Sequence, residues 1–321
     1  MNKILIVGGA GYVGGYLTDL LQENGYDVTV FDNLLYETRF LKKVKFIRGD
    51  VRNKDLLEKI ASNYDCIVWL AAIVGDGACE VNKKETKEVN EDSLKWLVDS
   101  NLAKKIIFTS TCSVYGACNE LISESSAANP LSVYAKTKLA AEKYLISNHS
   151  NCLVFRLGTL HGLGDLFSRI RLDLVANVLT YKATVGEKLT VFGGEQWRPL
   201  LHVRDVATAI LHSFKNNTTG LYNLSENNYK IHEIADEIQS IVGKVEVEKT
   251  SKSFEDLRNY RVSNNKILAT GWSPTYTLSC GIKDMKNLIE ENRITDISNP
   301  VYSNEAYLLT KSGEIYEDRF N

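Results

Sequence analysis

The sequence has little proline, little histidine, no long apolar run and almost no net charge. Its four prolines provide no proline-rich linker. The six cysteines show no CxxC spacing and there are only five histidines, so we expect neither a zinc site nor a disulfide framework. Free thiols are typical of a reducing compartment, which predicts a cytoplasmic protein. No apolar run approaches the ~18 residues of a membrane span, so no membrane association is expected.

The charge balance restricts the class of partner. There are 38 Lys and Arg against 40 Asp and Glu, a formal net charge of −2. A dedicated nucleic-acid binder would carry a basic face, so none is expected, although a nucleotide ligand remains compatible with this balance. A hydrophobic content of 44% and a charged content of 24% are ordinary for a folded globular chain of 321 residues.

Apolar runs and helical segments alternate through the first half of the chain. The predicted helices cover residues 12–24, 55–62, 90–101 and 132–147. Strict alternation predicts an α/β fold with a doubly wound, parallel Rossmann sheet in the strand order 3-2-1-4-5-6. Ligands bind such sheets at the carboxyl ends of the strands. The predicted strands are Lys3–Val7, Asp27–Phe31, Val44–Ile47, Cys66–Leu70, Lys105–Thr109 and Cys152–Arg156.

The pattern loosens after about residue 160, where a smaller α/β substrate-binding lobe with returns to the main sheet is expected. We predict three parts: a cofactor domain over 1–165, the lobe over 166–291 and a C-terminal tail over 292–321. Helices are predicted at 172–183, 203–215 and 231–242, and strands at 189–192, 221–224 and 245–249. The tail contains a break at Asn299-Pro300 and a glycine at 313, which favour either a hairpin or a loose tail.

A glycine-rich loop directly follows the first predicted strand. Gly8 suits the tight turn, Gly11 lets a pyrophosphate approach the backbone, and Gly14 lets the next helix pack closely. The amino end of that helix favours phosphate groups. Asp32 ends the second strand, where a carboxylate accepts hydrogen bonds from the ribose hydroxyls of NAD and repels the 2′-phosphate of NADP. The pattern therefore predicts NAD rather than NADP.

Neighbouring loop residues are further candidates for the cofactor site. The pair after the third strand is placed to meet the adenine ring, and small residues after the fourth strand let a cofactor run close to the backbone. Ordinary loops between strands and helices are the alternative interpretation for both segments. The remaining predicted cofactor residues are Tyr12, Val13, Asn33, Asp50, Val51, Leu70, Ala71 and Ala72.

The helix predicted at 132–147 carries a phenol and an ammonium group four residues apart. Tyr134 and Lys138 then share one helical face. The charge of Lys138, together with a nearby nicotinamide cation, would lower the phenol pKa from about 10 toward neutrality and make Tyr134 a general base. Thr111, after the fifth strand, can bridge substrate and base. An amphipathic helix with a surface lysine is the alternative.

Five segments together resemble the extended short-chain dehydrogenase/reductase family, specifically its NAD-dependent nucleotide-sugar epimerases and dehydratases. They are GGAGYVGG, FDNL, TSTCSVYG, YAKTK and LLHVRDVA, in the order of the family. The resemblance implies that Thr111, Tyr134 and Lys138 form the catalytic triad and that Lys138 also holds the nicotinamide ribose. It further implies a nucleotide-diphosphate sugar as substrate, and a homodimer built on the helices at 90–101 and 132–147.

Departures from the family pattern bear on the reaction and the substrate. Cys112 and Ser113 stand where the 4,6-dehydratases carry an acidic pair, which argues against dehydration, and Thr159 replaces an asparagine that contacts the sugar diphosphate in epimerases. The resemblance implies that these three residues and Thr111 contact the substrate. Arg198 and Arg258 resemble the diphosphate-binding arginines of the family, with surface arginines as the alternative.

Two further candidates and the overall function follow from the same resemblance. Arg171 and Asn177 are additional candidates for substrate contact, and the segment from Arg169 to Leu174 resembles a subgroup acting on unusual bacterial sugars. We therefore expect an NAD-dependent nucleotide-sugar epimerase that works through a 4-keto intermediate, in the synthesis of bacterial surface polysaccharides. A 4-dehydrogenase, a 4,6-dehydratase and a non-catalytic NAD(H)-binding protein are the alternatives, in that order.

Overall fold

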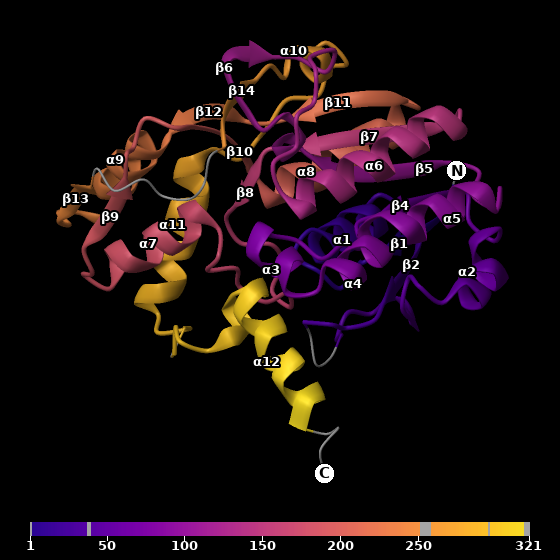
Figure 1. The fold of residues 1–321 in the computed structure, drawn as a ribbon, viewed down its shortest axis with the longest axis horizontal. Helices are drawn as coiled ribbons and strands as arrows, with labels where there is room; N and C mark the ends of the chain where they lie inside the picture. Colours follow the sequence, from indigo (N-terminus) through magenta and orange to yellow (C-terminus); the bar gives the residue numbers. More distant parts are fainter. Residues whose placement is uncertain (1, 37–39, 251–257, 295, 318–321) are drawn as a thin grey trace.

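A seven-stranded parallel sheet forms the centre of the computed structural model, which describes residues 2–36, 40–250, 258–294 and 296–317 (Figure 1). The strand order is β11-β7-β5-β4-β1-β2-β3, and every neighbouring pair is parallel. The predicted order of the first six strands is confirmed, with one more strand from the second half added beside the sixth. The strands are β1 (Lys3–Val7), β2 (Asp27–Asp32), β3 (Lys45–Arg48), β4 (Cys66–Trp69), β5 (Ile106–Thr111), β7 (Cys152–Leu157) and β11 (Gly220–Leu224).

Helices cover both faces of this sheet because its central strands are apolar on both sides. Successive side chains of a strand point to opposite faces. Ile4 and Ile6 pack toward α1 (Gly14–Glu23) and α8 (Val203–Lys215). Leu5 and Val7 instead join the core under the helices of the other face. Those helices are α2 (Lys54–Ala61), α5 (Ser93–Asp99) and α6 (Val133–Asn148).

The second half of the chain adds a smaller lobe with its own apolar core. A three-stranded sheet in the order β12-β10-β8 and a two-stranded pair β13-β9 pack with three helices. A further pair, β14-β6, joins the lobe to the loop after β5. These elements are β6 (Ala117–Ile122), β8 (Thr159–His161), α7 (Val175–Thr184), β9 (Leu189–Phe192), β10 (Trp197–His202), β12 (Asn227–Lys230), α9 (Ile231–Val242), β13 (Val247–Thr250), β14 (Asn259–Val262), α10 (Asn265–Leu268) and α11 (Leu278–Glu290).

Most predicted elements agree with the structure to within a few residues, and the differences have local causes. The first helix begins at Gly14 rather than residue 12, because the glycine loop occupies the positions before it. The predicted helix at 90–101 contains a π-helical turn, η1 (Glu88–Asp92), before α5. Two short helices after β4 have no counterpart in the prediction, α3 (Asp76–Val81) and α4 (Lys83–Lys87).

The C-terminal segment contradicts the expectation of a hairpin or a loose tail. It forms a short 3-10 turn, η3 (Pro300–Tyr302), and a helix, α12 (Asn304–Glu317). Leu308 of this helix packs in a cluster with residues of α3 and α6, so tertiary contact stabilises a helix despite the glycine at position 313. Figure 1 shows α12 between the lobe helices α7 and α11 and the helices α3 and α4.

A candidate active site at the carboxyl ends of the strands

A cleft of about 250 Å³ opens where β1, β2, β4 and β5 end. Its walls include Asp32 and Ser110 at the carboxyl ends of β2 and β5, and Gly8, Ala71 and Tyr134 from segments that follow other strands. This is the edge at which parallel α/β sheets bind ligands, because strand carboxyl ends and helix amino ends meet there. The structure thus brings the predicted cofactor loop and the predicted catalytic helix to one cavity.

The glycine loop has the geometry that close approach of a ligand requires. Gly8 has a φ of +82°, and a Cβ there would lie 2.5 Å from the backbone nitrogen of Ala71. A Cβ on Gly14 would lie 2.5 Å from the Cα of Gly9, so only glycine allows the helix to start this close to the turn. Gly11 lines the cleft, and its nearest obstacle to a Cβ is the carbonyl oxygen of Gly8 at 3.3 Å.

Asp32 is fixed in the cleft wall by backbone hydrogen bonds. Its carboxylate accepts from the amide of Ala10 at 3.0 Å and from the amide of Leu34 at 2.7 Å. Burial raises the pKa of this carboxyl, while these backbone bonds act in the opposite direction. Because each carboxylate oxygen has a second acceptor position, the fixed side chain still offers acceptors to a ribose.

Most of the other predicted cofactor residues lie in the same wall, but Asp50 does not. Asp50 forms an ion pair with Arg52 at 2.8 Å and accepts a bond from Asn33 at 3.2 Å. The guanidinium of Arg52 lowers the pKa of Asp50 to about 2. Asp50 therefore orients the wall rather than lining it. The cleft-lining residues from this group are Tyr12, Val13, Asn33, Val51, Leu70, Ala71 and Ala72.

Tyr134 and Lys138 line the opposite side of the cleft on α6. Lys138 is buried, with Nζ 4.0 Å from the ring centroid of Phe108. Thr111 hydrogen-bonds the phenol of Tyr134, and its hydroxyl also accepts the amide of Ser113 at 3.1 Å. The three predicted triad residues are thus adjacent, as a proton-transferring site requires.

Burial governs the protonation of this pair in the protein without a bound cofactor. Burial is the largest influence on the Tyr134 phenol and raises its pKa, and the negative charge of Asp76 raises it further. Burial also lowers the pKa of Lys138 to about 7. The protein groups alone therefore favour the neutral phenol, whereas the predicted lowering of the Tyr134 pKa includes the charge of a bound nicotinamide.

Cys112 is the predicted substrate residue that the structure contradicts. Its side chain is fully buried, and its thiol donates to the carbonyl oxygen of Arg156 at 3.2 Å. The 3-10 turn η2 (Cys112–Tyr115) directs the thiol into an apolar cluster with Val114 and Leu139. Cys112 therefore has no surface to offer a substrate, and burial raises the pKa of its thiol.

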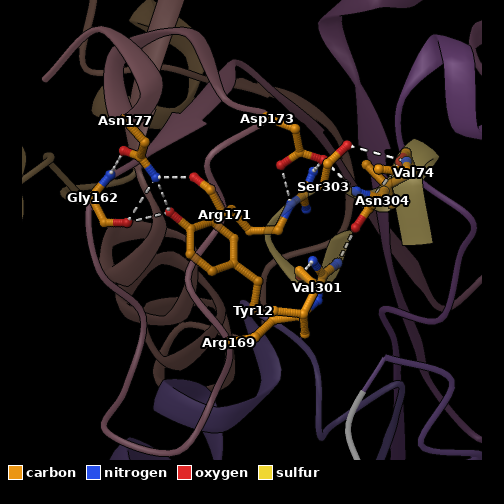
Figure 2. A network of polar contacts seen from close by, with 11 residues as sticks. Tyr12, Val74, Gly162, Arg169, Arg171, Asp173, Asn177, Val301, Ser303 and Asn304 are labelled. Atoms are coloured by element: carbon orange, nitrogen blue, oxygen red, sulfur yellow. Dashed lines mark hydrogen bonds and ion pairs between the residues drawn. The ribbon is translucent and has the colours of Figure 1, made fainter. Parts of the chain in front are cut away.

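The remaining predicted substrate residues are distributed around the cleft, and only one of them lines it. Arg171 lines the cleft and pairs with Asp173 at 2.6 Å. Asn177 is buried instead and accepts the amide of Gly162 at 2.9 Å. Figure 2 shows both side chains in one polar network with Tyr12, whose hydroxyl donates to the carbonyl of Gly162.

The two predicted diphosphate arginines lie side by side at the junction with the lobe. Arg198 is buried and donates to the carbonyl oxygen of Arg258. Arg258 lies 3.3 Å from the carboxylate of Asp76 and 3.4 Å from the hydroxyl of Ser113. Ser113 thus contacts Arg258, an arginine predicted to bind the diphosphate. Thr159 lies in β8, which pairs with β10, and it does not line the cleft.

Several cleft residues were not predicted from the sequence. Tyr36, Arg52, Ser110, Arg169 and Asn304 all line the cavity. The buried Ser110 and Tyr36 hydroxyls have no hydrogen-bond partner within the described ranges, as expected of groups that face a polar ligand. Ser110 directly precedes Thr111, so that position carried a sequence signal, whereas the other four lie in loops or in the C-terminal helix.

A doubly wound parallel sheet with a glycine turn after β1 defines a dinucleotide-binding protein. Residues 4–225 match the model of the NAD dependent epimerase/dehydratase family, and the chain belongs to that family. This membership confirms the predicted family, the enzyme class and the dependence on NAD. The glycine cradle and the unpartnered hydroxyls fit such a cofactor.

Two curated relatives and one solved structure are consistent with membership of this family. The chain is 28% identical to a putative UDP-glucose 4-epimerase of Methanocaldococcus jannaschii, over 91% of this chain and 100% of the relative. It is 27% identical to a UDP-glucose 4-epimerase of Halalkalibacterium halodurans, over 85% and 91%. The structure of a UDP-glucuronic acid 4-epimerase from Bacillus cereus, with UDP-glucuronic acid and NAD, superposes with a TM-score of 0.77 at 25% identity, covering 90% and 99%. Among the described residues, no helix is long and apolar enough to span a membrane.

Proposed function

We propose that this chain is a nucleotide-sugar 4-epimerase that keeps NAD bound and works through a 4-keto sugar. The observation that carries the proposal is that Tyr134 and Lys138 line the same cleft as the glycine loop, with Thr111 hydrogen-bonded to the Tyr134 phenol. The names of the two curated relatives support a 4-epimerase, and they make UDP-glucose the first substrate to test.

The residues of the cleft suit proton transfer at a sugar hydroxyl. NAD, when bound, supplies a reversible hydride acceptor for C4 of the sugar. With the positively charged nicotinamide bound beside it, the phenol of Tyr134 would be ionised, would take the proton of the C4 hydroxyl as the carbonyl forms, and would return it when the alcohol is restored. Thr111 holds the phenol through its hydrogen bond, and Lys138 supplies positive charge when protonated. The cofactor-facing residues would be Gly8, Gly11, Gly14, Tyr12, Val13, Asp32, Asn33, Val51, Leu70, Ala71 and Ala72, with Asp50 behind them.

Dehydration is less well supported than epimerisation. Elimination of water between C5 and C6 needs a general acid and a general base near those carbons. The 3-10 turn after Thr111 offers a fully buried thiol at Cys112 and a hydroxyl at Ser113, neither of which is a carboxylic acid. The neighbouring Asp76 carboxylate is paired with Arg258, a group we assign to the sugar diphosphate.

The setting of the enzyme is also part of the proposal. The six free cysteines support a reducing, cytoplasmic location. The exposed apolar side chain of Ile146 on α6 supports a homodimer through α5 and α6. The likeness of the segment around Arg169 and Arg171 to enzymes of unusual bacterial sugars supports a role in surface-polysaccharide synthesis.

A panel of UDP-, GDP-, CDP- and dTDP-sugars, with products identified by NMR, tests the proposed reaction. We expect a C4 epimer and no net reduction of NAD. Net NADH with a ketosugar product would instead identify a 4-dehydrogenase, and loss of water would identify a dehydratase. NAD binding without turnover of any sugar would identify a non-catalytic NAD-binding protein.

A further inference from the structure

The C-terminal segment bridges the lobe and the cofactor sheet across the cleft. We call residues 300–308 the strap. At its start, Tyr302 packs in an apolar cluster with Met285 and Ile289 of the lobe helix α11. Six residues later, Leu308 packs in the cluster that contains Tyr134. The two ends of the strap are therefore anchored on opposite sides of the cavity.

Asn304 is the middle of this bridge and is almost completely buried, at 2% exposure. It lines the cleft, and its side-chain amide donates to the carbonyl oxygen of Val74, after β4, at 2.7 Å. Its backbone amide donates to Asp173 at 2.9 Å, and its side-chain oxygen accepts from Arg169. Figure 2 shows these contacts joining three segments that are far apart in the sequence.

Arg169 links the strap to the cofactor side of the cleft, because it contacts both Val301 and Tyr36. Its guanidinium donates to the carbonyl oxygen of Val301 at 2.6 Å and lies 4.2 Å from the ring centroid of Tyr36. Tyr36 follows the Asp32 loop and lines the cleft, and its ring also lies 5.5 Å from that of Tyr307 in the strap. The strap therefore contacts both the cofactor-binding loop and the catalytic helix.

We propose that the strap retains bound NAD in the cleft, and that Asn304 is the positioning residue that fixes it there. Release of a dinucleotide through this side requires the strap to move. Movement breaks the three hydrogen bonds of Asn304 and separates Arg169 from Val301. Because the buried groups would be left without partners, opening is costly and release is slow. This proposal rests on the proposed function, since it takes NAD to occupy this cleft.

The rate of NAD release tests the strap directly. Full-length protein is loaded with NADH, and the fall in its fluorescence is followed after an excess of NAD is added. We expect Asn304→Ala and Arg169→Lys to release NADH at least tenfold faster than the wild type. Faster release at unchanged association would show that the strap acts on retention, which a merely destabilised fold would not reproduce. Arg169→Lys keeps the positive charge, so it tests the strap independently if Asn304→Ala does not fold.

Two matched controls are available. Leu309→Ala alters an exposed residue of the same helix, and Asn148→Ala removes an exposed asparagine at the end of α6. Both should release NADH at the wild-type rate. Release from Asn304→Ala and Arg169→Lys at that same rate would overturn the strap while leaving the proposed function intact. A wild-type chain that binds no NADH would contradict both proposals.

Discussion

The guanidinium of Arg258 lies 3.3 Å from the carboxylate of Asp76, which begins α3 beside the catalytic helix. One oxygen of Asp76 makes this ion pair, while its buried Oδ1 accepts no hydrogen bond from the residues that the structure describes. The negative charge of Asp76 also raises the pKa of Tyr134. The pair thus links the proposed phosphate-binding arginine to the proposed general base.

Asp76→Asn should act on substrate affinity and on the pH profile together. We expect a severalfold higher KM for the nucleotide sugar, because the charge that holds Arg258 in place is lost. Removal of a negative charge near Tyr134 stabilises its ionised form, so the rising limb of the kcat profile moves to lower pH. Steady-state kinetics between pH 5 and 9 measure both effects. Asp65→Asn, which breaks a surface ion pair with Lys104, is the control, and equal behaviour of the two variants would refute the role of Asp76.

Substitutions at two glycines of the loop should distinguish an effect on protein stability from an effect on NAD binding. Gly14→Ala places a Cβ 2.5 Å from the Gly9 backbone and should cost roughly 1–3 kcal/mol of unfolding free energy. Gly11→Ala meets only the Gly8 carbonyl oxygen at 3.3 Å, so we expect near-normal stability with at least tenfold weaker NAD binding. Urea unfolding and NAD titration measure these quantities. NAD affinity of the wild-type value in Gly11→Ala would show that this loop does not contact the cofactor.

Lys138 should make the stability of the NAD-free protein depend on pH. Burial lowers its pKa to about 7, below the ordinary value of 10.5 that it regains on unfolding. Between these values the unfolded chain binds more protons, so the unfolding free energy rises with pH through this window. Lys138→Met should remove that rise and stabilise the protein at pH 7 by up to roughly 4 kcal/mol. Unfolding of both proteins from pH 6 to 10 tests this, with the exposed Lys136→Met as control. If the unfolding free energies of the wild type and of Lys138→Met depend on pH in the same way, burial does not lower the pKa of Lys138.

The sheet and the cofactor loop could be predicted because their signals are local. Strands buried on both faces are recognisable as continuous apolar runs, and the turn after β1 needs glycines at fixed positions. The helix α6 carries Tyr134 and Lys138 one turn apart, so their common face followed from spacing alone.

The strap and the fate of Cys112 depend on contacts that spacing does not encode. Asn304 meets Arg169 and Val74 only because the fold brings three distant segments together. The break at Asn299-Pro300 favoured an irregular tail, whereas Pro300 instead begins the turn that leads into α12. Cys112 occupies a motif position, but the 3-10 turn that follows Thr111 directs its thiol into the core.

The interconversion of UDP-glucose and its C4 epimer by the wild type and by Tyr134→Phe tests the central claim most directly. NMR of the sugar ring protons follows both directions of the reaction. We expect turnover by the wild type and a 10²- to 10⁴-fold loss in Tyr134→Phe, because the general base is removed. Tyr144→Phe, on the exposed part of the same helix, should retain the wild-type rate. Undiminished turnover in Tyr134→Phe would contradict the assignment of Tyr134 as the proton-transferring residue.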